Sequence, residues 1–172
     1  MVETQAFPLF AVFKLDEDRY GILIDTVIQI VHMVAITTIP ASPDWLAGVI
    51  GFRGRIIPVV DLRVRFGLPK SIFELNTPII IVQSGKQVAG LIVDAMEGVL
   101  PLMLEDLQTP ADLTIQAKFI NAVTNQESKV TVIPNLPNIL AGTQKYDSQL
   151  NHRRKKPELN RVNPDPNDQS EL

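Results

Sequence analysis

Short runs of β-branched and aromatic residues recur along the chain, and turn-forming residues separate them. Valine and isoleucine account for 35 of the 172 residues, which favours pleated structure. Each run has the length of a strand and is too short for an ordinary helix. The spacing predicts about ten strands in a barrel or sandwich rather than alternating βαβ units. The runs are Phe10–Leu15, Tyr20–Ile24, Val27–Val31, Ile36–Ile39, Val49–Phe52, Ile56–Val60, Ile79–Val82, Val88–Val93, Val99–Leu102, Phe119–Val123 and Val130–Ile133.

Turn-forming residues stand where the predicted strands must reverse. Acidic residues at Asp16–Asp18, and small or polar residues at Ser84–Lys86 and Asn125–Ser128, predict three hairpin turns. The segment Pro101–Ala117 has no clear period, so it is assigned no element. Capping side chains and closing glycines predict three short helical turns, at Ser42 to Gly48, Asp61 to Gly67 and Asn135 to Gly142.

Residues 48–67 contain two β-branched runs with a glycine between them and a capping residue after them. Gly54 can adopt the positive φ that a tight turn requires, so Arg53 and Arg55 are predicted to flank a hairpin tip. Asp61 is placed to accept hydrogen bonds from the first amides of a short helix. An arginine beside an exposed turn offers a planar donor fork and an aliphatic surface, and both are useful at a protein interface.

Composition removes several classes of protein. The absence of cysteine excludes disulfides, thiolate zinc sites and a cysteine nucleophile. No apolar run approaches the roughly 20 residues that cross a bilayer, and the N-terminus lacks the pattern of a signal peptide. We therefore expect a soluble, cytoplasmic protein without direct membrane insertion.

The composition of residues 143–172 differs from that of residues 1–142. The first 142 residues carry 10 basic and 14 acidic side chains, which does not suit a nucleic-acid binder. The last 30 residues are polar and contain three prolines and no glycine, so burial cannot offset their ordering entropy. We expect one folded domain at 1–142 and a mostly disordered tail at 143–172. The basic run His152–Lys156 leaves contact with nucleic acid or anionic lipid as a remote alternative.

The chain offers no convincing catalytic or ligand-binding motif. A catalytic triad needs a histidine beside the nucleophile, but His32 follows a predicted strand and His152 lies in the tail. Asp16–Asp18 lacks the spaced oxygen ligands of a calcium loop. Asp61 and Asp94 fit a helix cap and a strand end, although an enzyme that uses either carboxylate alone stays as an alternative. We therefore expect no enzymatic activity, no cofactor and no metal site.

Residues 48–67 read Gly-Val-Ile-Gly-Phe-Arg-Gly-Arg-Ile-Ile-Pro-Val-Val-Asp-Leu-Arg-Val-Arg-Phe-Gly. This segment closely resembles the signature of the CheW-like family of bacterial chemotaxis coupling proteins. The resemblance extends over nearly all of residues 7–140. Phe10–Leu15 and Tyr20–Ile22 resemble the first hairpin of the family, and Gly90–Leu100 resembles its second recurring motif.

The resemblance implies a mainly β fold of two small, interleaved five-stranded SH3-like β-barrels, with a groove between them and a few short helices. It also implies a signalling adaptor that joins the cytoplasmic tip of a methyl-accepting chemoreceptor to the regulatory domain of a CheA-like histidine kinase. Val27 and Gln29 fall where the family contributes to partner contacts, and Arg53 falls on the arginine associated with receptor binding. The expected partner-binding set is completed by Gly51, Gly54 and Arg55.

Three positions depart from the pattern of the family. Gly51 stands where asparagine is common, Gln29 where glutamate is common, and Pro134-Asn135 where a leucine-aspartate pair is common. The choice of receptor and kinase is therefore left open. So is the output, because a related adaptor of a pathway that controls type IV pilus-based surface motility would show the same resemblance.

Overall fold

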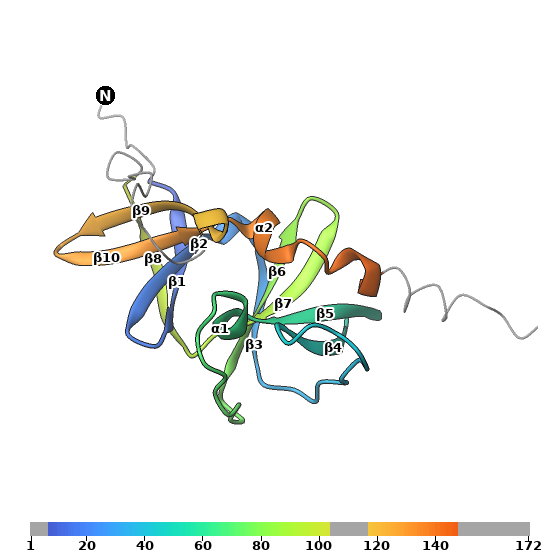
Figure 1. The fold of residues 1–172 in the computed structure, drawn as a ribbon. Coiled ribbons are helices and arrows are strands. Elements are labelled where there is room, and N and C mark those ends of the chain that lie inside the picture. Colours follow the sequence, from blue (N-terminus) through green and yellow to red (C-terminus); the bar gives the residue numbers. More distant parts are fainter. Residues whose placement is uncertain (1–6, 104–116, 148–172) are drawn as a thin grey trace, which may run out of the picture.

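The computed structural model describes residues 7–103 and 117–147, in which ten strands form two five-stranded sheets (Figure 1). The first sheet, in spatial order, consists of β8 (Ala95–Pro101), β1 (Leu9–Leu15), β2 (Asp18–Leu23), β10 (Lys129–Pro134) and β9 (Ile120–Gln126). The second consists of β3 (Val27–His32), β6 (Pro78–Ser84), β7 (Gln87–Ile92), β5 (Arg55–Asp61) and β4 (Leu46–Phe52). The short helical elements are η1 (Ile24–Thr26), α1 (Leu62–Arg65), η3 (Ala117–Phe119) and α2 (Leu136–Leu140).

The two sheets are interleaved along the chain. The chain forms β1 and β2 of the first sheet, crosses to the second for β3 to β7, and returns to the first for β8 to β10. Most neighbouring strands pair antiparallel, whereas β2 with β10 and β5 with β7 pair in parallel. The expected mainly β fold of two interleaved five-stranded units with few short helices is confirmed.

Strands β1, β6 and β7 are buried along most of their length, which explains why their sequences are continuous apolar runs. In β6, Ile79 and Ile81 belong to a cluster made by the second sheet alone. Ile80 and Val82 face the other way, into a larger cluster that also contains Phe13 of β1. We call this larger cluster the shared core, because it takes side chains from both sheets and from α1 and α2.

The predicted helix caps at Asp61 and Asn135 are present. The backbone N–H of Val64 donates to Asp61 Oδ1 at 3.3 Å, and the N–H of Asn138 donates to Asn135 Oδ1 at 3.0 Å. These bonds satisfy amides in the first turns of α1 and α2, which have no partner within the helix. Gly67 has a φ of 83°, the left-handed conformation expected of the residue that ends α1.

The helical turn predicted from Ser42 to Gly48 is wrong. Ser42 Oγ donates to the carbonyl oxygen of Ile39 at 2.8 Å, and β4 follows instead of a helix. Gly48 has a φ of 146°, and a Cβ at this position would overlap the carbonyl oxygen of Thr37. Thr37 forms an isolated β-bridge with Val49. The strand predicted at 36–39 is therefore reduced to this single bridge. This long-range pairing overrides the local helix signal.

The packed chain continues past the expected domain boundary at residue 142. Thr143 is buried, and its Oγ1 donates to the carbonyl oxygen of Leu140 at 2.7 Å. Tyr146 is also buried, within a helical turn over residues 144–147. The rest of the predicted tail, with its basic run at 152–156, lies outside the described residues, as do residues 104–116.

Candidate functional site

The hairpin between β4 and β5 ends in a two-residue turn made by Arg53 and Gly54. Their φ angles are 47° and 76°, and a type I′ hairpin turn requires positive values at both positions. Arg53 therefore forms the tip itself instead of flanking it. A positive φ is uncommon for a residue with a side chain, and such conformations concentrate at functional sites.

The side chain of Arg53 reaches from this turn to β3, the opposite outer strand of the second sheet. Its Nη2 donates to Gln29 Oε1 at 3.3 Å, and its guanidinium lies 5.0 Å from the centroid of the Phe52 ring. Arg53 and Gln29 are both exposed. The fold thus brings together two of the predicted partner-binding residues that are 24 positions apart in the sequence.

The other predicted partner-binding residues have different environments. Gly51 and Gly54 are exposed, and a Cβ added at either one would meet nothing within 4 Å. Val27 is half-buried against the shared core, at a bulge where β3 shifts its register. Arg55 forms an ion pair with Asp147 at 3.4 Å, so it ties the hairpin to the end of the described chain. Gly51, Gly54 and Arg55 thus belong to the same hairpin as Arg53, and Val27 belongs to the same strand as Gln29.

Strand β3 also exposes apolar side chains that the sequence did not single out. Ile30, next to Gln29, is 40% exposed, and Val34, just beyond the strand, is 44% exposed. Large apolar side chains beside a polar pair are typical of protein interfaces. In the sequence Ile30 looks like one more member of a buried run, and only the outer position of β3 in the sheet exposes it.

An ion cluster joins the two sheets beneath α1. Arg63 Nη1 donates to Asp16 Oδ1 and to Asp94 Oδ2, at 2.6 Å in each case. Asp16 belongs to the β1–β2 turn, and its backbone N–H also donates to Asp94 Oδ2, at 2.7 Å. The hydrogen bond to Asp16 is the main cause that raises the pKa of Arg63. Asp94 therefore holds the junction of the sheets, a role consistent with its expected place at a strand end.

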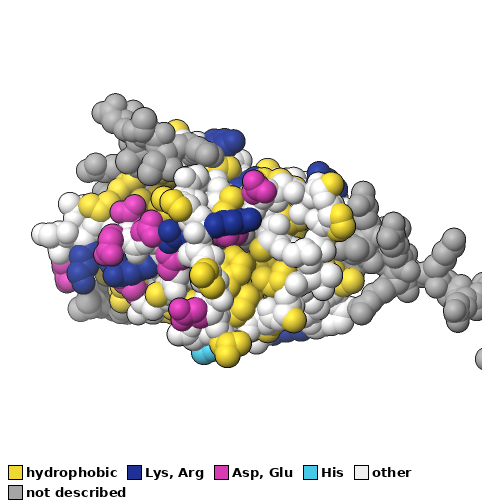
Figure 2. All heavy atoms as spheres, turned by 60° about the horizontal axis from the view of Figure 1, so that its bottom comes forward, with side chains coloured by type: hydrophobic (Ala, Val, Ile, Leu, Met, Phe, Trp, Pro, Cys, Tyr) yellow, Lys and Arg dark blue, Asp and Glu magenta, His cyan; other side chains and the backbone are white. Residues whose placement is uncertain are grey.

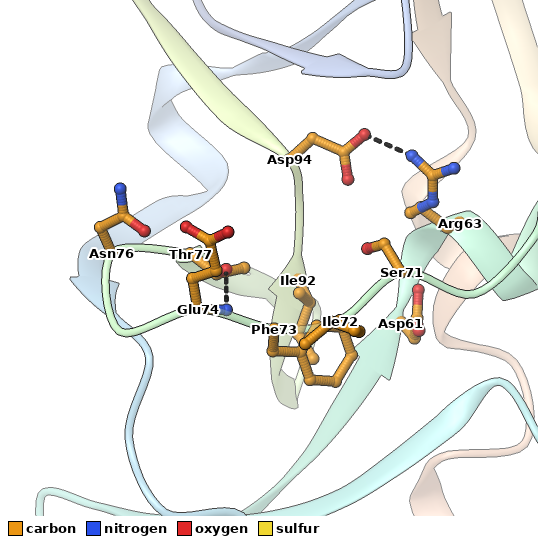
Figure 3. Close-up of a pocket in the computed structure, with 10 residues that line it drawn as sticks. All are labelled: Asp61, Arg63, Ser71, Ile72, Phe73, Glu74, Asn76, Thr77, Ile92 and Asp94. Carbon is orange, nitrogen blue, oxygen red and sulfur yellow. Dashed lines mark hydrogen bonds and ion pairs between the residues drawn. The ribbon is translucent and has the colours of Figure 1, made fainter.

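A cavity of about 300 Å³ opens beside this cluster, between α1, the loop that follows it, and the ends of β5 and β7. Figure 3 shows Asp61 and Glu74 on either side of the apolar side chains of Ile72 and Phe73. Burial raises the pKa of Asp61, a residue that is only 1% exposed. Its Oδ1 caps α1, while its Oδ2 has no hydrogen-bond partner among the described residues.

The surface around this region combines apolar and charged areas. Figure 2 shows hydrophobic side chains gathered in the middle of the face, with acidic and basic side chains interspersed on one side of them. Within residues 7–103 and 117–147, no group of three or more histidine, aspartate or glutamate side chains is arranged to hold a metal ion. No helix in the same ranges is both long and apolar enough to cross a membrane.

Comparison with known proteins gives a consistent result. The family model of the CheW-like domain matches residues 9–144. A crystal structure of the scaffolding protein TtCheW from Thermoanaerobacter tengcongensis superposes with a TM-score of 0.73 and 36% identity, covering 79% of this chain and 89% of that one. The chain therefore belongs to the CheW-like family, a family of signalling scaffolds.

Two relatives show the range of similar proteins. The chemotaxis protein CheW of Klebsiella aerogenes is 28% identical over 137 residues, which cover 78% of this chain and 82% of that protein. Protein FrzA of Myxococcus xanthus is 26% identical over 101 residues, which cover 59% of this chain and 63% of that protein. The recognition made from residues 48–67 is thereby confirmed.

Proposed function

We propose that this chain is a non-enzymatic adaptor that couples a chemoreceptor to a chemotaxis-type histidine kinase in the cytoplasm. One part of its surface would bind the cytoplasmic tip of the receptor, and another would bind the regulatory domain of the kinase. The adaptor acts by holding its partners in place, and it makes or breaks no bond. Membership in a family of scaffolds supports this role.

The observation that carries the proposal is the exposed Arg53–Gln29 pair. It joins a hairpin tip to an outer strand that carries the exposed apolar residue Ile30. An arginine can stack on apolar groups and donate two parallel hydrogen bonds, which makes it a frequent anchor at protein interfaces. The bare surface at Gly51 lets a partner approach the hairpin closely.

The output pathway is a separate question. The relatives include FrzA as well as proteins named for chemotaxis, so family membership does not fix the pathway. An adaptor for type IV pilus-based motility is the second candidate. Purification of the tagged chain from its source cells, followed by identification of the receptor and kinase that it retains, distinguishes the two. Retention of neither class of protein would contradict both.

The substitution Arg53→Glu tests the site itself. We expect receptor co-purification to fall at least about tenfold, since losing an arginine anchor costs about 2 kcal/mol or more. Stability should change by less than about 0.5 kcal/mol, because the side chain is exposed. Lys86→Glu reverses a charge at the exposed β6–β7 turn and serves as the matched control. Equal receptor binding by the two variants would show that Arg53 is not part of the receptor-binding site.

A further inference from the structure

The loop between α1 and β6 carries the two most exposed large apolar side chains of the described residues. Ile72 is 91% exposed and Leu75 is 90% exposed, whereas the next in order, Val130, is 54% exposed. Single apolar side chains at a surface are common, but two so exposed within one short loop mark a candidate interaction site. In Figure 1 this loop is the green chain that projects at the bottom of the molecule.

Contacts at both ends of the loop, and one in its middle, hold it in place. Arg63 Nε donates to the carbonyl oxygen of Pro69 at 2.8 Å, and the N–H of Glu74 donates to Thr77 Oγ1, also at 2.8 Å. Between these contacts, Phe73 packs against the apolar cluster of the second sheet. The loop therefore presents its apolar side chains from a defined position, so that covering them costs little ordering entropy.

The backbone of the loop is free to pair as well. Within the described part of the chain, the N–H groups of residues 70–73 donate to no other residue, and the segment belongs to no helix or strand. Free backbone donors and acceptors, like those at the edge of a sheet, can pair with another chain. A second chain can therefore bond to the main chain of the loop while it covers the side chains.

Opposite charges stand symmetrically about Ile72. Lys70 precedes it by two positions and Glu74 follows it by two. Both are exposed, and neither forms an ion pair within the described ranges. When two copies of this segment run antiparallel about Ile72, the Lys70 of each copy lies opposite the Glu74 of the other. The segment is therefore complementary in charge to itself, as a contact with two-fold symmetry requires.

The loop lies away from the Arg53–Gln29 pair. Arg53 forms the tip of the β4–β5 hairpin, whereas the loop follows α1, which begins at the other end of β5. The strand between them has 7 residues. Its two ends are therefore about 20 Å apart, and the loop is a surface separate from the Arg53 surface.

We propose that residues 70–75 form a contact through which two copies of this chain pair about a two-fold axis. The Ile72 side chains of the two copies pack on each other, and each Lys70 forms an ion pair with the Glu74 of the other copy. Leu75 is covered at the edge of the same contact. Because each copy uses its loop once, association stops at the dimer. The contact does not depend on the adaptor function.

Sedimentation velocity of the full chain, from about 10 μM to about 1 mM, tests for the dimer. A contact this small should have a dissociation constant on the order of 0.1 mM. Ile72→Asp should weaken dimerisation at least about tenfold, because it places two like charges at the centre of the contact. Val130→Asp introduces the same charge at an exposed apolar position of β10 and serves as the matched control. A chain that stays monomeric throughout, or equal dimerisation by the two variants, would overturn the proposal.

Exchange of the two charges tests the symmetry of the contact. Lys70→Glu and Glu74→Lys should each dimerise about tenfold more weakly than the wild type, because each replaces two opposite-charge pairs by two like-charge pairs. An equal mixture of these two variants restores both opposite-charge pairs, so it should form a mixed dimer as stable as the wild-type dimer. Failure of the mixture to recover would contradict the two-fold contact. A monomeric chain in which Ile72→Asp instead reduces retention of a receptor or kinase would assign the loop to that partner, against the proposal.

Discussion

Arg65 clamps the C-terminal helix onto the rest of the fold, and its removal should cost about 3 kcal/mol. Its guanidinium donates to three carbonyl oxygens at the end of α2, those of Ile139, Asn138 and Ala141, at 3.1, 3.2 and 2.8 Å. It also lies 3.9 Å from the ring centroid of Trp45. Positive charge at a helix C-terminus is favourable, because the last carbonyls of a helix lack the partners that its inner carbonyls have. The carbonyl oxygen of Asn138 also accepts the backbone N–H of Ala141, at 3.3 Å.

The magnitude follows from the separate contributions. Hydrogen bonds to a charged donor contribute about 1.5 to 3 kcal/mol each when buried, and a cation–π contact contributes about 0.5 to 2 kcal/mol. Arg65 is only partly buried, so water replaces some of each bond and the full sum does not apply. For Arg65→Ala we therefore expect a loss of about 3 kcal/mol and a fall in Tm of about 6 to 12 °C.

Urea and thermal unfolding, followed by circular dichroism, measure this loss. Arg65→Lys keeps the charge but not the planar fork, so it should lose about half as much stability. A loss below about 0.5 kcal/mol in Arg65→Ala would refute the reasoning, because it would mean that the three carbonyl bonds are replaced by water without cost.

Three further predictions concern single side chains. Burial raises the pKa of Asp61, so the folded state binds more protons than the unfolded state and loses stability as the pH rises above the ordinary pKa of 3.8. The stability of Asp61→Asn relative to the wild type should therefore be higher at about pH 7 than at about pH 3.5. A difference between the urea midpoints of the two proteins that is the same at both pH values would contradict this. Burial, together with the charges of Asp18 and Asp16, raises the pKa of Tyr20 to about 12. Subtracting the ultraviolet titration of Tyr20→Phe from that of the wild type should therefore give a curve with its midpoint near 12. A midpoint near 10 would exclude a buried phenol. Gly48→Ala should destabilise the fold by about 2 to 4 kcal/mol, because the added Cβ would overlap Thr37. Gly51→Ala, the control, should change stability by less than about 0.5 kcal/mol. Similar unfolding midpoints for the two variants would show that stability does not require glycine at position 48.

The sequence predicted best those features that depend on neighbours in the chain. The caps at Asp61 and Asn135 form within three residues of their partners, so the local pattern contains the whole interaction. The expected helix after Ser42 failed because Thr37 pairs across to β4, where Gly48 has a positive φ of 146° and no room for a Cβ. That requirement comes from a strand pairing that no local signal describes.

The candidate site divides in the same way. The turn at Arg53 and Gly54 was visible in the sequence. The bond from Arg53 to Gln29 was not, because it forms only where the fold brings the tip of the β4–β5 hairpin within reach of β3, the outer strand at the opposite edge of the second sheet. The role of Arg63 was missed entirely. Its partners Asp16 and Asp94 lie 47 and 31 positions away, in different sheets or connections, and only the fold brings their charges together.

The order in which the chain visits the two sheets makes the second barrel an insertion within the first. Strands β1 and β2 precede the inserted part, while β8, β9 and β10 follow it. No single cut of the chain can therefore release one complete barrel from the other. Since both barrels contribute side chains to the shared core, they form one cooperative unit. A partner that binds either barrel therefore stabilises the other barrel as well.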